Sequence, residues 1–265
     1  MNFVERVANA SPEAGTLELF WLGQAGFLIK TSDAKTIVID PYLSDCVERM
    51  FPENGLGFKR LSPAPMKPED MAVDYLLISH EHGDHFDVDS MPGFMKNGKT
   101  RLYANRPVAR AAREMGFDGV YALNKGEVVS LEGFSLLPVD CDHGELAPEA
   151  MGFILDFGFA SIYYAGDTAL TPERLRVPTE LSPDVAILPI NGAFGNLDGE
   201  QAAKYAGMLK SRIVIPCHFW TFPLHLGNPQ QIIDAMPKFA PESKLELLCQ
   251  GEGITIKGRQ ARRRP

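Results

Sequence analysis

Short runs of apolar and β-branched residues, separated by turn-forming residues, dominate the hydropathy pattern of this chain. Residues 36–39 form one such run, and it ends in an Asp-Pro pair, which predicts a buried strand followed by a loop. Residues 73–79 form a second run of the same kind. The same pattern predicts strands over 16–22, 25–30, 128–131, 135–139, 152–157, 161–165, 185–190 and 213–216.

Three segments have a helical pattern instead. Residues 107–115 begin with proline, contain alanines and arginines, and are followed by glycine, which is typical of a helix from its first turn to its end. Residues 199–210 and 230–239 are expected to form two more helices. Strands come first and then alternate with helices, so the order indicates a large α/β sandwich of two sheets with outer helices.

Chain length, charge and cysteine spacing narrow the expected domain number, partners and cellular location. The 265 residues contain no internal repeat, which favours one domain over 1–265, with a short lead over 1–15 and a basic tail over 258–265. Lys and Arg number 26 against 34 Asp and Glu, a net charge of −8, which disfavours nucleic acid as a partner. No membrane span or export signal is expected, and the four separated cysteines are typical of reduced thiols, so we expect a cytoplasmic protein.

The candidate chemistry begins directly after the second apolar run, where residues 80–85 read H-E-H-G-D-H. Alternate residues of an extended stretch share a face, so His80 and His82 can approach one metal ion together. Gly83 allows the chain to turn and to direct Asp84 and His85 at a second ion. Imidazole and carboxylate groups suit zinc, manganese or iron. A polar loop with solvated histidines is the alternative, but four ligand-type residues in six positions argue against it.

Three further candidate ligands follow three other predicted strands. They are His143, Asp167 and His218, and each of them alone would be interpreted as a structural histidine or a turn carboxylate. Together with residues 80–85, they place ligand-type side chains at the ends of four strands, which is how a rigid scaffold builds a site for two metals. The sixth histidine, His225, lies shortly after His218, and both a substrate contact and a structural role stay open for it.

With these residues in place, the sequence resembles the metallo-β-lactamase-fold hydrolases over roughly residues 17–257. The resemblance implies a four-layer αββα sandwich with two metals in a groove at one edge of its sheets. It further implies one ion held by His80, His82 and His143, a second held by Asp84, His85 and His218, and Asp167 bridging both. Asp40, which matches the first motif of the family, would lie behind the ligands and bond one of them or the backbone.

Within that superfamily, the chain is most similar to the L-ascorbate-6-phosphate lactonase-like branch. The similarity is carried by W-L-G-Q-A-G-F over 21–27, I-D-P-Y-L-S-D over 39–45, R-L-S-P-A-P over 60–65, L-P-I-N-G over 188–192 and I-P-C-H over 215–218. The third motif differs from that of the lactonase, so the resemblance does not imply activity on ascorbate 6-phosphate itself.

The leading interpretation is a hydrolase with two divalent ions that opens a small sugar-acid lactone, phosphorylated or not, through a metal-bound hydroxide. Asp84, Asp167 and His225 are the candidate catalytic residues, with Asp84 as proton carrier to the leaving group. A phosphodiesterase on cyclic nucleotides or RNA and a non-catalytic metal-binding protein are the alternatives. A small-molecule substrate is the expected partner, a homo-oligomer is left open, and substrate contacts are expected from Gln24, Arg60, Asn191, Trp220 and Phe222.

Overall fold

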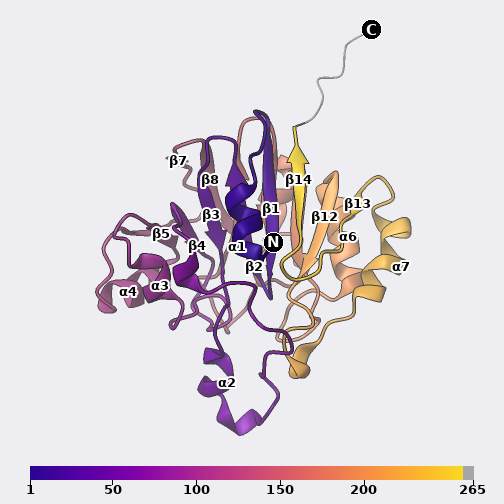
Figure 1. Ribbon diagram of the computed structural model, residues 1–265. Helices are drawn as coiled ribbons and strands as arrows, with labels where there is room; N and C mark the ends of the chain where they lie inside the picture. Colours follow the sequence, from indigo (N-terminus) through magenta and orange to yellow (C-terminus); the bar gives the residue numbers. More distant parts are fainter. Residues whose placement is uncertain (259–265) are drawn as a thin grey trace.

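The computed structural model describes residues 1–258, so the predicted basic tail lies, apart from Gly258, outside the described residues. Within 1–258 the chain forms two seven-stranded sheets that pack face to face, with helices against their outer faces (Figure 1). Both sheets mix parallel and antiparallel neighbours. The four-layer αββα sandwich expected from the sequence is therefore confirmed.

The first sheet has the strand order β14-β1-β2-β3-β4-β5-β6. Its strands are β1 (Thr16–Gly23), β2 (Gly26–Thr31), β3 (Thr36–Ile39), β4 (Tyr75–Ile78), β5 (Arg101–Ala104), β6 (Val120–Ala122) and β14 (Gly253–Lys257). The sequence pattern missed β5, β6 and β14, all of which are short. β14 pairs antiparallel with β1, so the last described strand lies beside the first.

The second sheet has the order β13-β12-β11-β10-β9-β8-β7. Its strands are β7 (Val129–Leu131), β8 (Phe134–Asp140), β9 (Met151–Asp156), β10 (Ser161–Tyr164), β11 (Val185–Pro189), β12 (Ile213–Cys217) and β13 (Lys244–Leu245). The sequence predicted all of these strands except β13, to within one or two residues at their ends.

The three predicted helices agree with α4 (Arg106–Glu114), α6 (Gly199–Leu209) and α7 (Pro229–Phe239) to within one residue. The sequence did not predict the remaining helical segments, which are α1 (Phe3–Asn9), α2 (Cys46–Met50), α3 (Met91–Met95), α5 (Arg176–Leu181) and the short 3₁₀ turns η1 (Pro52–Asn54), η2 (Pro68–Asp70) and η3 (Pro223–His225). None of the helices within 1–258 has the length and hydrophobicity that crossing a bilayer requires.

Burial on both faces of the sheets explains why the strands read as continuous apolar runs. In β1, Leu19 and Trp21 face the space between the sheets, whereas Phe20 and Leu22 belong to an outer cluster with residues of α1, α3 and α4. The helix α1 lies within the predicted N-terminal lead and packs on this outer face through the edge-on contact of Phe3 with Phe20. The lead is thus part of the outer helical layer.

Parallel pairing sets the position of the candidate site. β3 and β4 are parallel neighbours in the first sheet, and β10, β11 and β12 are parallel in the second. The carboxyl ends of parallel strands meet at one edge, and the loops that follow them carry side chains from there. From this end α2 and the chain after it project away from the sandwich (Figure 1); we call residues 46–61 the projecting segment.

Candidate metal centre

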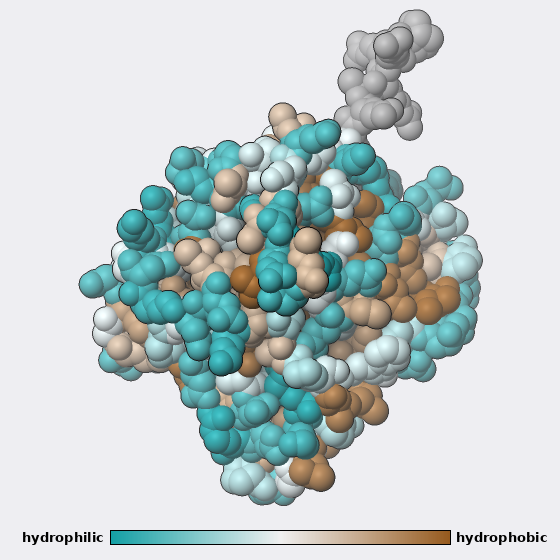
Figure 2. All heavy atoms as spheres, viewed as in Figure 1, coloured by the Kyte–Doolittle hydropathy of each residue, from teal (hydrophilic) through white to brown (hydrophobic). Residues whose placement is uncertain are grey.

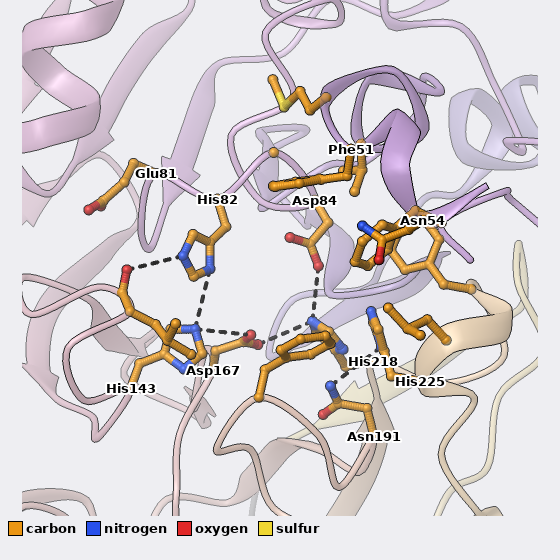
Figure 3. Close-up of a pocket in the computed structure, with 18 residues that line it drawn as sticks. Phe51, Asn54, Glu81, His82, Asp84, His143, Asp167, Asn191, His218 and His225 are labelled. Atoms are coloured by element: carbon orange, nitrogen blue, oxygen red, sulfur yellow. Dashed lines mark hydrogen bonds and ion pairs between the residues drawn. The ribbon is translucent and has the colours of Figure 1, made fainter. Parts of the chain in front are cut away.

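Three histidines from two loops converge to form the first ligand group. The Nε2 of His80 lies 3.0 Å from the Nδ1 of His82. The Nε2 of His143 lies 3.3 Å from the same nitrogen of His82 (Figure 3). One oxygen of Asp167, Oδ2, lies 3.7 Å from the Nε2 of His143. These four side chains offer ligand atoms that all lie within 4.8 Å of one another.

A second ligand group lies on the other side of Asp167. It consists of Asp84, His85 and His218, whose ligand atoms also lie within 4.8 Å of one another. The Nε2 of His218 lies 3.2 Å from Oδ2 of Asp84. The other oxygen of Asp167, Oδ1, lies 3.3 Å from the Nε2 atoms of both His85 and His218. The two oxygens of Asp167 therefore face two different groups.

Behind the second group, the fully buried carboxylate of Asp40 holds His85 in place. Asp40 Oδ2 lies 2.7 Å from the Nδ1 of His85 and accepts a hydrogen bond of 2.7 Å from the hydroxyl of Tyr164. Asp40 also accepts from both the backbone N–H and the hydroxyl of Ser79. A carboxylate on one ring nitrogen fixes the orientation of the imidazole, so the Nε2 of His85 is directed toward Asp84 and Asp167.

Left-handed backbone occurs at four predicted site residues. Gln24, Asp40, His218 and Trp220 have φ angles of 48°, 41°, 61° and 57°. Such a conformation costs a residue with a side chain about 1–2 kcal/mol, and such strain concentrates at functional sites. Two hydrogen bonds to the carbonyl of Gln24 hold this backbone conformation at Gln24 and His218. The backbone N–H of His218 donates to it over 2.8 Å, and Trp21 Nε1 donates to it over 3.0 Å.

Burial and mutual charge set the protonation of the two groups. Burial lowers the pKa of His80 and of His143, which favours the neutral imidazole that binds metals. Burial raises the pKa of Asp84 and Asp167, but the neighbouring histidines outweigh it and hold both pKa values well below their usual range. Burial also lowers the pKa of His85, yet the surrounding carboxylates, led by Asp167, raise it well above its ordinary value.

The donor chemistry fits divalent metal ions. Five histidines and two carboxylates converge in a buried region, and ionised carboxylates complement a divalent charge. The Nε2 of His85 and Oδ1 of Asp167 are buried and have no hydrogen-bond partner among the described residues. Buried polar atoms of this kind call for a partner, and a cation between the groups would provide one.

A cavity of about 490 Å³ opens onto both groups. Eight of the residues singled out from the sequence line it: His82, Asp84, His143, Asp167, Asn191, His218, Phe222 and His225. His80, His85 and Asp40 do not line this cavity, and all three are fully buried. The structure thus brings the predicted ligands together around one cavity.

Three other predicted substrate contacts lie elsewhere. The Nε2 of Gln24 donates to Oδ2 of Asp84 over 2.8 Å, so this side chain orients Asp84 and does not line the cavity. Arg60 directs its Nη1 to the carbonyl of Tyr42 over 2.7 Å, and it is absent from the cavity wall. Trp220 is 57% exposed and also does not line the cavity. The structure therefore does not bring Arg60 or Trp220 to the site.

His225 lies next to the second ligand group. Its ring stacks on His218 at a centroid distance of 5.4 Å and meets Phe222 edge-on at 5.1 Å. Its Nδ1 lies 3.5 Å from the amide nitrogen of Asn191. Burial, followed by the nearby His218, lowers the pKa of His225 to about 4. The sixth histidine is therefore part of the cavity wall and belongs to neither ligand group.

Two sets of residues at the site were not found from the sequence. Ser79 and Tyr164 bind Asp40, and their positions at the ends of predicted strands could have indicated this role. The other set is an apolar wall of eight residues, of which only Phe222 was predicted; four of the other seven, including Phe51 and Phe58, belong to the projecting segment. Apolar residues in an irregular stretch carry no signal of their own, because only the fold shows what they face.

Comparisons with known proteins agree with this geometry. A family model described as a β-lactamase superfamily domain matches residues 18–218. A UPF0173 metal-dependent hydrolase of Hyperthermus butylicus is 31% identical over 237 residues, which cover 88% of this chain and 96% of that protein. A protein of the same description from Polynucleobacter asymbioticus is 29% identical over 277 residues, covering 94% of this chain and 90% of that one.

Solved structures have a similar fold. A metallo hydrolase from the archaeon Ignicoccus hospitalis superposes with a TM-score of 0.71 at 25% sequence identity. The superposition covers 92% of this chain and 100% of that one. An isothiocyanate hydrolase from Delia radicum gut bacteria superposes with a TM-score of 0.73 over 91% of this chain and 99% of that one. Its identity is 18%, so this second likeness concerns the fold alone.

Proposed function

The chain belongs to the UPF0173 metal-dependent hydrolases of the β-lactamase superfamily, and from this premise we propose that it hydrolyses an ester or lactone bond with two divalent metal ions. The observation that carries the proposal is the position of Asp167. Its Oδ1 faces His85 and His218, whereas its Oδ2 faces His143. A carboxylate between two ligand groups can bind one ion with each of its oxygens, which suits a two-metal site.

In this proposal each ligand group holds one ion. The first ion would be bound by His80, His82 and His143, the second by Asp84, His85 and His218, and Asp167 would bind both. Zinc, manganese and iron all suit these donors. When bound, the two ions would polarise the scissile carbonyl and lower the pKa of a water molecule at the centre.

The residues of the chain position the substrate and move its protons. Asp84 lines the cavity, and its carboxylate is oriented by the amide of Gln24. It is therefore placed to carry a proton to the leaving oxygen. Asn191 and His225 lie on the cavity wall and contact each other at 3.5 Å. We assign these two side chains to orienting the substrate beside Asp84.

Hydrolysis of an ester or lactone is favoured over that of a phosphodiester by the charge of the wall. No lysine or arginine of the described chain lines the cavity, and Glu81 adds a negative charge to it. Beyond the ions themselves, nothing there would compensate the charge of a nucleic-acid backbone. Turnover of bis(p-nitrophenyl) phosphate alone, in a panel that also holds neutral lactones and sugar lactones, would contradict the proposal.

The proposal predicts that Asp167→Asn loses metal and turnover together. The asparagine offers one neutral oxygen where two ionised oxygens face the groups, so metal content should fall from about two ions per chain toward one or none. Elemental analysis of the purified variant, beside turnover of the lactone panel, measures both. Asp234→Asn on α7 removes a carboxylate that, among residues 1–258, accepts a hydrogen bond from its neighbour Gln230 only, and it should change neither. Full turnover by Asp167→Asn after metal loss would refute the two-ion role.

A further inference from the structure

The cavity beside the ligand groups combines a polar floor with an apolar wall. Candidate ligands form the floor, among them Asp84, Asp167 and His218. Eight apolar residues form the wall: Val47, Met50, Phe51, Phe58, Leu146, Phe194, Phe222 and Leu224. A substrate whose scissile bond lies on the floor must place the rest of its structure against this wall.

Aromatic rings connect the mouth of the cavity to its floor. Phe51 packs against Phe58 at 5.4 Å, and Phe58 meets Phe222 edge-on at 5.6 Å. Phe222 in turn contacts His225 at 5.1 Å, and His225 stacks on His218 at 5.4 Å. Ring spacings of this size are those of favourable aromatic contacts. The apolar surface therefore continues from the solvent to a candidate ligand.

Two segments far apart in sequence are bonded together to build this wall. The backbone N–H of Leu224 donates to the carbonyl of Gly57 over 2.9 Å, and Leu61 donates to Thr221 over 3.0 Å. Beneath them, Phe222 packs on Tyr42 in a small separate core with Val47. The wall is thus held in place by its own packing and hydrogen bonds.

The rim of the cavity stays apolar where it reaches solvent. Phe51, Phe194 and Leu224 are 43%, 48% and 49% exposed, which is unusual for large apolar side chains that lie close together. Figure 2 shows hydrophobic residues at the lower end of the molecule, where the projecting segment leaves the sandwich in Figure 1. Exposed apolar patches beside a concave site mark places where an apolar ligand binds.

The wall offers nothing to balance an anionic substrate. Outside the two ligand groups, Glu81 is the one charged residue among the described residues that line the cavity. Its carboxylate accepts a hydrogen bond of 2.9 Å from Asn105. Both arginines of the projecting segment are engaged elsewhere: Arg60 is held by the Tyr42 carbonyl and lies over the Tyr42 ring at 4.8 Å, and Arg49 pairs with Asp89. Removing a phosphate or carboxylate from water without a countercharge is costly.

We propose that the substrate of this centre carries a neutral apolar group, aromatic or aliphatic, which packs against the wall of Phe51, Phe58, Phe194 and Phe222. The inference rests on the proposed ester or lactone hydrolysis and names its substrate class. It replaces the small sugar-acid lactone, phosphorylated or not, that the sequence favours. A cavity of about 490 Å³ lies within the range that accommodates small-molecule ligands.

A substrate series with metal-loaded protein tests the preference. The series comprises p-nitrophenyl acetate, butyrate and hexanoate, the aromatic lactone dihydrocoumarin, and gluconolactone with its 6-phosphate. We expect kcat/KM to rise about threefold for each methylene buried in the acyl series. Dihydrocoumarin should exceed gluconolactone 6-phosphate by at least about tenfold. A phosphorylated lactone that is turned over as well as dihydrocoumarin would overturn the inference.

A matched pair of variants locates the effect on the wall. Phe194→Ala removes a half-exposed ring from the wall, and Tyr121→Ala removes a ring of similar exposure, 46%, from β6, away from the cavity. Phe194→Ala should lower kcat/KM for the hexanoate about fivefold or more, mainly through KM, and lower that for the acetate by a smaller factor, because the acetate has less apolar surface to bury. Phe194→Arg should shift the preference toward the 6-phosphate. Equal effects of Phe194→Ala and Tyr121→Ala, or a change of oligomeric state with the substrate preference intact, would contradict the inference.

Binding of a neutral fluorophore separates this inference from the proposed function. N-phenyl-1-naphthylamine brightens in apolar pockets, and its affinity can be measured with and without metal. Wild-type protein should bind it at least about fivefold more tightly than Phe194→Ala, while Tyr121→Ala matches wild type. If the probe binds but no ester or lactone is turned over at full metal content, the proposed hydrolysis is refuted, whereas the apolar binding site is supported. Probe binding unaffected by Phe194→Ala would refute the wall, whatever the turnover.

Discussion

At the scale of single residues, Asp40 shows how a buried carboxylate organises the centre without facing the cavity. It lies directly after β3, and it accepts hydrogen bonds from Ser79 and Tyr164 as well as contacting His85. The position of Asp40 after an apolar run was visible in the sequence. Its bonding partners come from two other strands, so no local pattern could name them.

We expect Asp40→Asn to lower metal affinity about 10–100-fold, because the neutral amide no longer fixes the orientation of His85. The new N–H₂ group would face hydrogen-bond donors, so stability should fall by about 1–3 kcal/mol. Competition with a chelating dye measures the first effect and urea denaturation the second. Tyr164→Phe removes a single bond to the same carboxylate and should have the smaller effect on both. Unchanged metal affinity in Asp40→Asn would show that Asp40 does not position His85.

The cysteines give a second prediction at this scale. Burial raises the pKa of both Cys46 and Cys141 to about 12, and it raises that of Cys217 well above its ordinary value. Cys249 is exposed. Because the thiolate is the reactive form, Ellman's reagent at pH 8 should modify about one thiol per native chain, and all four after unfolding. Cys249→Ser should abolish the native reaction; rapid modification of a second thiol would contradict this burial.

At the scale of elements, most strands and the long helices followed from the sequence, but β5, β6, β13, β14 and the projecting segment did not. Apolar β-branched runs indicated β3 and β4, and the helical patterns over 199–210 and 230–239 indicated α6 and α7. The structure shows that Asp198 and Asn228 cap the N-termini of these two helices. The projecting segment contains only short helical turns, α2 and η1. Its shape depends on bonds to the loop after β12, which lies far away in the chain.

The contact between α6 and α7 gives a prediction for one helix pair. A Cβ added at Gly207 of α6 would collide with the carbonyl oxygen of Phe239, the last residue of α7. Gly207→Ala should therefore destabilise the protein by about 1–3 kcal/mol despite the better helix propensity of alanine. Urea denaturation measures the change. Glu200→Gln on the same helix alters one exposed ion pair and should stay within about 0.5 kcal/mol. A Gly207→Ala protein as stable as wild type would mean that the helices can move apart freely.

At the scale of the whole molecule, the centre exists because two sheets end at the same edge. His80 and His82 follow β4 of the first sheet, whereas Asp167 and His218 follow β10 and β12 of the second. The face-to-face packing of the sheets brings these loops together. Metal binding should therefore stabilise the folded chain as a whole, since the ligands are collected only in the folded state.

Removal of the metal by a chelator should lower the apparent Tm by about 5–10 °C, because ions at 100 times their Kd contribute about 2.7 kcal/mol to stability. Differential scanning fluorimetry with parallel elemental analysis provides the measurement, and readdition of zinc or manganese should restore the Tm. Asp167→Asn should show a smaller shift on the same treatment. An unchanged Tm after complete loss of metal would indicate that the ligand groups do not link the two sheets.

The sequence by itself determined an α/β sandwich of two sheets with outer helices and the identity of the ligand-type side chains, and its resemblance to the metallo-β-lactamase-fold hydrolases implied the four-layer αββα order. The periodicity and composition of hydrophobic residues indicate which side of each segment is buried. His and Asp residues directly after apolar strands can be recognised in the sequence alone. Only the tertiary structure decided what surrounds them. Asp167 lies between two ligand groups, Gln24 orients Asp84, and Arg60 is turned away from the cavity. Apart from Phe222, the apolar wall was also decided only by the tertiary structure. An apolar residue in an irregular segment has no local signature, because packing between distant parts of the chain sets what it contacts.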